Sequence, residues 1–299
     1  MNTPLFGANI DPNVTELNTA LAIAQLADQT GLDMVLCQDH PYHKDHLDTW
    51  TLITTVAAQT ERVHIGTNVA NLPLRTPTML AKMAASLDVI SGGRLELGLG
   101  AGAFWKGILA YGGREDLQDK PFTAFKESLD IIQGMWANSD GNFRYEGTIY
   151  TVKGMRPGPA PAHPIRIWVG GYGPKMLRLI GAQGDGVNLS STYISYPQLT
   201  EVNKQIDAGA QAAGRDPDTV RRLYNVMGVI TSQATSDGFA GKTYAGTIEQ
   251  WIDHLVMLYQ HYRQDTFVYW PTEGDFVAQM QRFAEEVVPG VRQAVDAPQ

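Results

Sequence analysis

The sequence predicts an α/β fold in which residues 1–299 form one domain, a single (β/α)8 TIM barrel. Short apolar runs alternate with segments of helical periodicity, which is the pattern of βα units around a parallel sheet. Eight such units can be followed along the chain, and an open doubly wound sheet usually has fewer strands. A length of 299 residues also lies within the range of single α/β barrels.

The predicted strands are eight short apolar runs, most of them bounded by turn-forming residues. They cover residues 6–10, 34–38, 64–69, 95–99, 165–169, 186–189, 223–230 and 266–270. The predicted helices cover residues 15–30, 49–60, 77–90, 122–136, 174–183, 197–213, 247–262 and 275–288. Thr76 before Pro77 predicts a helix N-cap, and Gly31 and Gly184 lie where helices commonly end.

Two segments are longer than ordinary connections in such a barrel. Residues 138–164, between strands four and five, contain several aromatic residues and the Pro/Gly-rich stretch GMRPGPAPAHP. They predict an inserted hairpin and a loop that extends like a lid. Residues 232–245 predict a second long, polar loop. We expect both near the mouth of the barrel.

Composition and charge favour a small-molecule substrate. The chain is 43% hydrophobic and 18% charged, so a folded core is expected. A net charge of -8 without a Lys/Arg run predicts no nucleic-acid partner and no anionic membrane surface. The start of the chain lacks a leader pattern and no long apolar stretch occurs, so we expect neither export nor membrane spanning. Cys37 is the only cysteine, which excludes an intrachain disulfide and a cysteine-rich metal site and fits the cytoplasm.

Chemically distinctive residues fall at the predicted carboxyl ends of the strands, where barrel enzymes carry their sites. Strand two ends in QDHPYH, strand three in NVANLP, strand four in GLGAGAFW and strand five in GGYGPK. The last of these segments, residues 170–175, leads from a strand into a helix. Its backbone N–H groups, the helix N-terminus and Lys175 would surround a point suited to a phosphate, with a flexible turn as the alternative.

The segment GLGAGA, residues 98–103, has the spacing of a dinucleotide fingerprint, but the helix and acidic strand end of a Rossmann unit do not follow it. We interpret its glycines as room for a planar ring to approach the backbone, with barrel closure as the alternative.

His40, at the end of strand two, is the main catalytic candidate because its imidazole can donate or accept a proton near neutral pH. A structural hydrogen bond to a loop is the alternative. His40, His43 and His46 alternate with aspartates, and a metal site is a minor alternative to a solvated polar loop, so we expect no metal. Neither a nucleophile elbow nor a P-loop or HExxH motif is present, which leaves hydrolysis with little support.

The segment ASLDVISGGRLELGLGAGAFW, residues 85–105, resembles the most recognisable part of the bacterial-luciferase-like flavin and F420 oxidoreductases. The segments QDH, GTNVANLPLRTP and VGGYGPKML occur in the same order as in that family, so the resemblance covers most of the chain. It implies FMN, or alternatively coenzyme F420, bound at the strand ends. It also implies a cis peptide between Asn68 and Val69 that forms a bulge behind the cofactor ring.

By the same resemblance, His40 matches the family's active-site histidine, and homodimers are common. The superfamily's F420-dependent sugar-phosphate dehydrogenases carry a glutamate where this chain has Ala103 and a tryptophan where it has Lys44, so that reaction is not expected. The residues implied around the ring are Asp39, Asn68, Val69, Asn71, Ala101 and Gly102, and those around the ribityl phosphate are Gly171, Tyr172, Gly173, Lys175 and Met176.

These observations lead to a main functional hypothesis and three alternatives. The main one is an FMN-dependent monooxygenase that oxygenates a small organic substrate with O2, reduced flavin from a separate reductase or NAD(P)H, and a proton moved by His40. F420-dependent hydride transfer would use the same pocket without oxygen. A non-catalytic flavin-binding protein belongs to a different class, since fold does not imply function. A metal-dependent hydrolase that uses His40 and His43 comes last.

Overall fold

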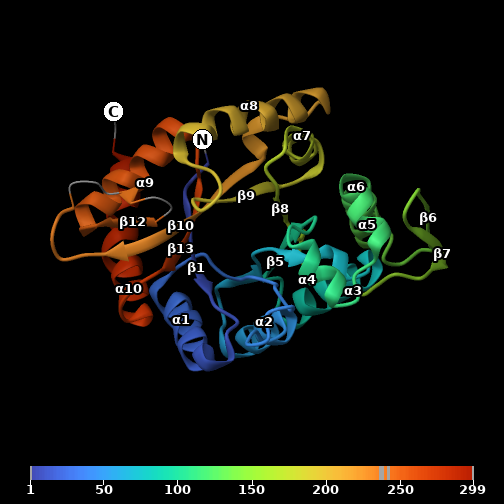
Figure 1. Cartoon of the computed structure of the whole chain (residues 1–299), viewed down its shortest axis with the longest axis horizontal. Helices are drawn as coiled ribbons and strands as arrows, with labels where there is room; N and C mark the ends of the chain where they lie inside the picture. The colour runs from blue at the N-terminus through green and yellow to red at the C-terminus, as the bar shows by residue number, and fades with distance from the viewer. Residues whose placement is uncertain (1, 236–238, 241–242, 298–299) are drawn as a thin grey trace.

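The computed structural model describes residues 2–235, 239–240 and 243–297 (Figure 1). Within these residues, eight parallel strands form a closed barrel, because each pairs with the next and the last pairs with the first. The predicted (β/α)8 barrel is therefore confirmed, and every predicted strand overlaps an observed one. The barrel strands are β1 (Leu5–Ile10), β2 (Met34–Cys37), β3 (His64–Thr67), β5 (Leu95–Gly100), β8 (Ile167–Gly170), β9 (Gly186–Ser190), β10 (Arg221–Ile230) and β13 (Thr266–Pro271).

Helices surround the barrel and bury their apolar faces against it (Figure 1). Gly31 ends the first helix with a left-handed φ of 86°, as predicted, whereas Thr76 occupies an N-cap position without a side-chain capping bond. In the described part of the chain, no helix is long and apolar enough to cross a membrane. The main helices are α1 (Leu17–Thr30), α2 (Thr49–Gln59), α3 (Pro77–Ile90), α6 (Pro121–Ala137), α7 (Pro174–Gln183), α8 (Tyr196–Ala212), α9 (Ile248–Tyr262), α10 (Phe276–Arg282) and α11 (Val288–Asp296).

Two segments of the described chain contain short elements that were absent from the sequence prediction. The segment after β5 contains the short helices α4 (Trp105–Ala110) and α5 (Glu115–Asp119). The predicted loop 232–245 contributes β12 (Thr243–Gly246), which lies parallel to β10, and β11 (Phe239–Ala240), which is antiparallel to β12. Residues 236–238 and 241–242 of that loop lie outside the described residues.

The predicted hairpin insertion is present as β6 (Phe143–Glu146) and β7 (Thr151–Met155). It lies beside α6 at the edge of the molecule (Figure 1). Phe143 packs against Gly134 of α6, where an added Cβ would come within 2.5 Å of the Phe143 ring. The hairpin therefore covers the flank of the barrel and does not extend across its mouth like a lid.

One carboxylate holds the turn of this hairpin. The backbone N–H groups of Thr148, Ile149 and Tyr150 donate to Glu127 of α6 at 2.6, 2.9 and 2.9 Å. Burial raises the pKa of Glu127, but the three N–H donors outweigh burial and leave the pKa lowered. An ionised Glu127 therefore fixes the turn mainly through main-chain groups, and the Thr148 side chain adds one hydrogen bond.

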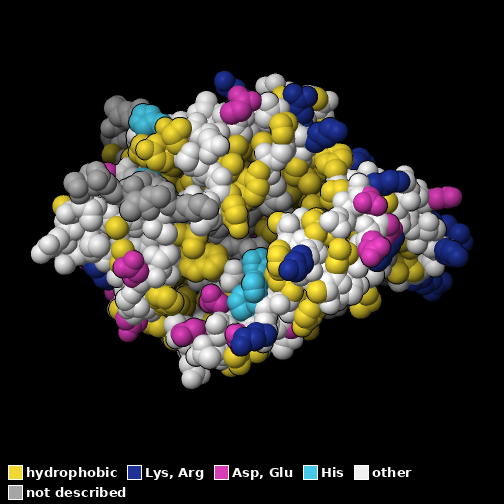
Figure 2. Space-filling view, in the orientation of Figure 1, with side chains coloured by type: hydrophobic (Ala, Val, Ile, Leu, Met, Phe, Trp, Pro, Cys, Tyr) yellow, Lys and Arg dark blue, Asp and Glu magenta, His cyan; other side chains and the backbone are white. Residues whose placement is uncertain are grey.

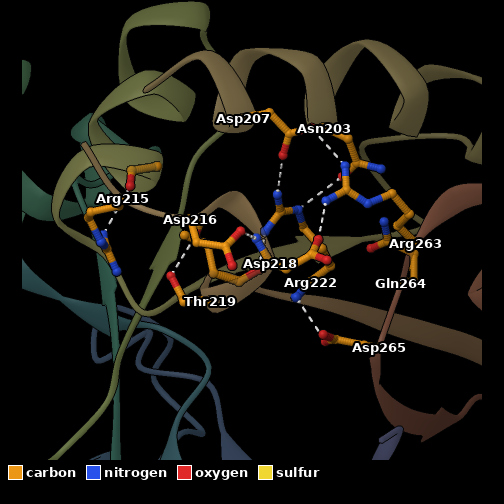
Figure 3. A network of polar contacts seen from close by, with 12 residues as sticks. Asn203, Asp207, Arg215, Asp216, Asp218, Thr219, Arg222, Arg263, Gln264 and Asp265 are labelled. Carbon is orange, nitrogen blue, oxygen red and sulfur yellow. Dashed lines mark hydrogen bonds and ion pairs between the residues drawn. The ribbon is translucent and has the colours of Figure 1, made fainter. Parts of the chain in front are cut away.

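A buried ion-pair network joins α8, β10 and the end of α9 (Figure 3). Arg222 is almost fully buried, and its guanidinium donates to Asp207 at 2.8 Å and to Asn203 at 3.1 Å. Arg263 donates to the other oxygen of Asp207 at 2.6 Å. Burial lowers the pKa of Arg222 and the charge of Asp207 opposes this effect, so Asp207 is the counter-ion that makes the burial tolerable.

We expect Asp207→Asn to lower the free energy of unfolding by about 2–3 kcal/mol, because it leaves a buried guanidinium without its counter-ion. Denaturant unfolding followed by circular dichroism measures the change. The control is Asp216→Asn, since Asp216 is exposed and an asparagine preserves its capping role. Equal unfolding midpoints for the two variants would contradict the prediction.

Candidate functional site

The carboxyl ends of the barrel strands surround a hollow near the centre of the face in Figure 2. A patch of histidine (cyan) lies on one side of this hollow, where Figure 1 places the segment between β2 and α2, and apolar side chains lie on the others. His40, His43 and His46 belong to that segment, and their rings lie within 6.5 Å of one another. The histidine patch therefore lies at the barrel mouth, which is the end at which the sequence predicted the site.

The peptide bond between Asn68 and Val69 is cis, as the resemblance implies. It joins β3 to the short strand β4 (Ala70–Asn71), which pairs with the end of β5. The Val69 side chain fills the space beside Gly100, where an added Cβ would come within 2.7 Å of a methyl group, and an added Cβ at Gly98 would collide with the Thr67 carbonyl oxygen of β3. Gly100 therefore makes room for Val69 and Gly98 for the neighbouring strand, so these contacts favour the alternative of barrel closure over room for a cofactor ring.

At this bulge, four asparagines form one hydrogen-bonded cluster, three of them from barrel strands and Asn68 from the segment between β3 and β4. Asn68 Nδ2 donates to Asn9 at 2.9 Å and to Asn225 at 2.7 Å, and Asn188 donates to Asn68 Oδ1 at 2.9 Å. Sequence analysis found only Asn68. The other three asparagines could have been noticed, because each is a polar residue within a mostly apolar strand segment: FGANI, GVNLS and LYNVM.

Asp39 is buried, and its carboxylate binds other groups of the protein. Its carboxylate accepts the Asn71 backbone N–H at 3.0 Å and the guanidinium of Arg75 at 3.0 and 3.1 Å. Arg75 also pairs with the more exposed Asp48 at 2.7 Å. Both carboxylate oxygens of Asp39 are thus used, so the residue positions the segment after the bulge. Sequence analysis missed Arg75, although it is the one charged residue in NLPLRTP.

Asn71 carries an acceptor that no protein group uses. Its side-chain Oδ1 is buried and has no hydrogen-bond partner among the described residues. Ala101 and Gly102 follow β5 and are half-buried, and Gly102 has a φ of 87° that only glycine adopts easily. An added Cβ at Gly102 would meet Pro73 at 2.8 Å. An unused buried acceptor normally has a partner, so Asn71 fits a ligand that supplies an N–H or O–H donor.

His40 is half-buried at the mouth and has aromatic neighbours. Its ring stacks on Tyr42 at 5.6 Å, and Tyr42 meets Phe104 of the loop after β5 edge-on at 5.2 Å. Burial lowers the pKa of His40, and His43 and His46 lower it further, against a smaller opposing effect of Asp39. His40 is therefore mainly neutral at pH 7 and able to accept a proton.

The histidine patch does not form a metal site by itself. His46 Nε2 lies 3.9 Å from Asp11, but within the described part of the chain the ligand atoms of His40, His43 and His46 do not converge as a metal requires. This arrangement therefore does not support the alternative of a metal-dependent hydrolase that uses His40 and His43.

The predicted strand–turn–helix that would bind a phosphate is present between β8 and α7. Gly173 is the N-cap of α7 and no side chain caps the free N–H groups, while Lys175 is exposed in the first turn. Gly171 is required because an added Cβ would collide with Met176. Tyr172 contacts Tyr193 at a ring distance of 5.6 Å. Among the described contacts, none joins Lys175 to His40, so the cradle and the histidine are separate parts of the mouth.

Comparison with known sequences identifies relatives along much of the chain. The profile of the luciferase-like monooxygenase family matches residues 4–260. The 5,10-methylenetetrahydromethanopterin reductase of Methanolobus tindarius is 35% identical over 72% of this chain and 62% of its own length, so the chain spans less than two thirds of that protein. The F420-dependent glucose-6-phosphate dehydrogenase of Microbacterium testaceum (strain StLB037) is 31% identical over 76% of this chain and 68% of its own length.

Solved structures show the same fold. An F420-dependent secondary alcohol dehydrogenase superimposes with a TM-score of 0.81 over 97% of this chain and 99% of its own, at 18% identity. The monooxygenase RslO1 from Streptomyces bottropensis gives 0.81 over 95% and 99%, at 21% identity. Identities this low show the barrel alone, but the profile match covers most of the sequence. The chain therefore belongs to the luciferase-like monooxygenase family of oxidoreductases.

Proposed function

We propose that this protein is an F420-dependent oxidoreductase that transfers a hydride between the cofactor and a small organic substrate. The observation that carries the proposal is His40, a half-buried imidazole at the barrel mouth whose pKa is lowered by burial, which can take the hydroxyl proton when the carbon that bears the hydroxyl loses a hydride. The relatives support F420 as the cofactor, because F420 dependence is named for the Microbacterium protein at 31% identity. This choice reverses the order of the two cofactors that sequence analysis expected.

The residues at the mouth fit a deazaflavin or a flavin. The unused Oδ1 of Asn71 would accept a ring N–H, and the free N–H groups at the start of α7 with Lys175 would hold the phosphate. The bound cofactor would supply the hydride acceptor or donor. The protein's own groups would do the rest: Arg75 and Asp39 fix Asn71, and a ring nitrogen of His40 moves the substrate proton.

FMN-dependent oxygenation is the second candidate, favoured by the match of residues 4–260 to a family described as monooxygenases. It would need a supply of reduced flavin, from a separate reductase or from NAD(P)H, and neither source is indicated by the relatives named above.

Titration of the purified, cofactor-free protein distinguishes the two candidates. F420 and FMN are added separately at low phosphate concentration, and quenching of tryptophan fluorescence is followed. We expect saturable, selective binding of F420, then anaerobic bleaching of F420 absorbance with a small alcohol. Selective FMN binding with O2 uptake would overturn the proposal in favour of oxygenation, and tight binding of either cofactor without turnover would favour a non-catalytic binding protein.

Lys175→Ala should weaken cofactor binding about tenfold, because it removes one charge-assisted contact to the phosphate. The fluorescence titration measures the change. Lys204→Ala is the matched control, since Lys204 is an exposed lysine on α8 and its only described ion pair, at 3.9 Å, is with Glu201. Equal affinities of the two variants would place the phosphate elsewhere.

The pH dependence of alcohol oxidation should report His40. Because the pKa of His40 lies below 6.5, kcat/KM should be constant near neutral pH and fall on the acid side, where the proton acceptor becomes charged. His43→Asn removes a neighbouring imidazole that lowers this pKa, so the fall should move to higher pH. Rate measurements across the acid range test this, and an unchanged profile in His43→Asn would contradict it.

A further inference from the structure

Three metal-ligating residues meet at the end of the barrel opposite the mouth. His64 is the first residue of β3, Glu96 is the second residue of β5, and His163 lies in the segment that leads into β8. Their candidate ligand atoms all lie within 4.8 Å of one another. We propose that these three residues bind a divalent transition-metal ion of the zinc type.

Two orphaned nitrogen atoms point to a missing partner. His64 Nδ1 and His163 Nε2 are both buried, and neither makes a hydrogen bond within the described residues. The two rings lie 5.9 Å apart at an angle of 73°, so the edge of one ring faces the other ring. Buried polar atoms without a partner are rare in folded proteins, and an ion that both nitrogens bind would account for the pair.

The distances suit a tetrahedral ion. Zinc binds histidine nitrogen and carboxylate oxygen at about 2.0–2.1 Å, so two ligand atoms of a tetrahedral site lie about 3.4 Å apart. His64 Nδ1 lies 3.3 Å from Glu96 Oε1, which is this spacing, although the contact lacks the geometry of a hydrogen bond. Only the His163 nitrogen would have to approach.

Asp88 fixes His163 in the form that a metal needs. Its fully buried carboxylate accepts backbone N–H groups of Leu95, Ala162 and His163 at 3.1, 2.7 and 3.0 Å. It lies 2.7 Å from His163 Nδ1, so that nitrogen is the donor and Nε2 keeps its lone pair. A carboxylate behind a histidine ligand is a recurrent arrangement in zinc proteins.

Glu96 is also held in place. Trp168 Nε1 donates to Oε2 at 2.8 Å, which leaves Oε1 toward His64. Arg166 lies 3.5 Å from the same Oε1, but its side chain is 41% exposed and can turn into solvent. Arg166 is therefore the partner that an ion would replace at Oε1 of Glu96.

The position of the site indicates a structural role. The N-terminal end of such a barrel commonly contributes to stability, and catalysis takes place at the other end. An ion held by His64, Glu96 and His163 would tie β3 and β5 to the entry of β8. Since the three ligands come together only in the folded chain, binding would raise the melting temperature.

The test uses the full chain after removal of metals with a chelator. Co²⁺ is added as a spectroscopic probe, then Zn²⁺ as a competitor, and the melting temperature is measured with and without Zn²⁺. We expect one equivalent of Co²⁺ to give the visible absorption of a four-coordinate site, Zn²⁺ to displace it, and Zn²⁺ to raise the melting temperature by several degrees. His64→Ala should lower the Co²⁺ affinity at least tenfold.

His43→Ala is the matched control, because it removes a histidine from the mouth cluster and leaves the proposed site intact. Melting of each variant without metal shows whether it folds, and Glu96→Gln provides a second ligand variant should His64→Ala fail to fold. Absence of saturable Co²⁺ binding would overturn the proposal. So would an affinity that His64→Ala and Glu96→Gln leave unchanged, or one that His43→Ala abolishes. None of these results depends on the cofactor at the mouth.

Discussion

Asp39→Asn is expected to lower the free energy of unfolding by about 3 kcal/mol and to weaken cofactor binding. The substitution keeps the shape of the side chain but removes the fully buried counter-ion of Arg75, whose guanidinium then retains only the more exposed Asp48 as its ion-pair partner. The same carboxylate fixes the Asn71 backbone, so the unused acceptor of Asn71 would lose its position. Denaturant unfolding and the fluorescence titration measure the two effects.

Asp48→Asn provides a close control, because Asp48 binds the same guanidinium from a more exposed position and caps α2. An asparagine can keep the cap, and an exposed ion pair contributes at most about 1 kcal/mol. Similar losses of unfolding free energy in Asp39→Asn and Asp48→Asn would show that burial of the Asp39–Arg75 pair does not determine how much the pair stabilises the fold.

His40→Ala should lower turnover by roughly 100-fold to 10,000-fold, which is the usual contribution of a well-placed general acid or base. Cofactor affinity should change much less, because the phosphate cradle at the start of α7 is a separate part of the mouth. Steady-state kinetics at saturating cofactor tests the first expectation, and the fluorescence titration tests the second.

Two variants make the His40 result specific. His43→Ala removes an imidazole from the same patch, so it should retain most of the activity. His40→Gln keeps polarity without a titrating group, so it should be as slow as His40→Ala and should lack the fall in rate on the acid side. Normal turnover in His40→Ala would show that another group moves the proton.

The sequence was sufficient for the barrel because each strand is an apolar run long enough to stand out from its neighbours. Helix ends could be predicted from the residues at those positions, as at Gly31. The short helices α4 and α5 were missed because five or six residues hold too little periodicity to recognise. The hairpin 143–155 was foreseen, but its place on the flank depends on Glu127 and Gly134 of α6, which a local pattern does not reveal.

The same limit decides which parts of the candidate site the sequence could reveal. The strand-end segments could be found because the barrel brings all carboxyl ends to one mouth. Contacts that depend on the register of distant strands could not. Asn68 and Asn225 are 157 residues apart, and Asp39 and Arg75 are 36 apart with no motif joining them. His64, Glu96 and His163 are also far apart in the sequence, and their spacing resembles no metal-binding motif.

The attachment of the hairpin turn to Glu127 has an evolutionary consequence. Three of the groups that bind Glu127 are main-chain N–H groups, which every residue except proline possesses, and the Thr148 side chain adds a further hydrogen bond. Tyr150, in that turn, lines a small apolar pocket with Ala101 and Trp105. Mutation of Tyr150 would change the wall of this pocket while the main-chain bond to Glu127 stays, which makes the turn a place where related proteins can diverge in substrate preference.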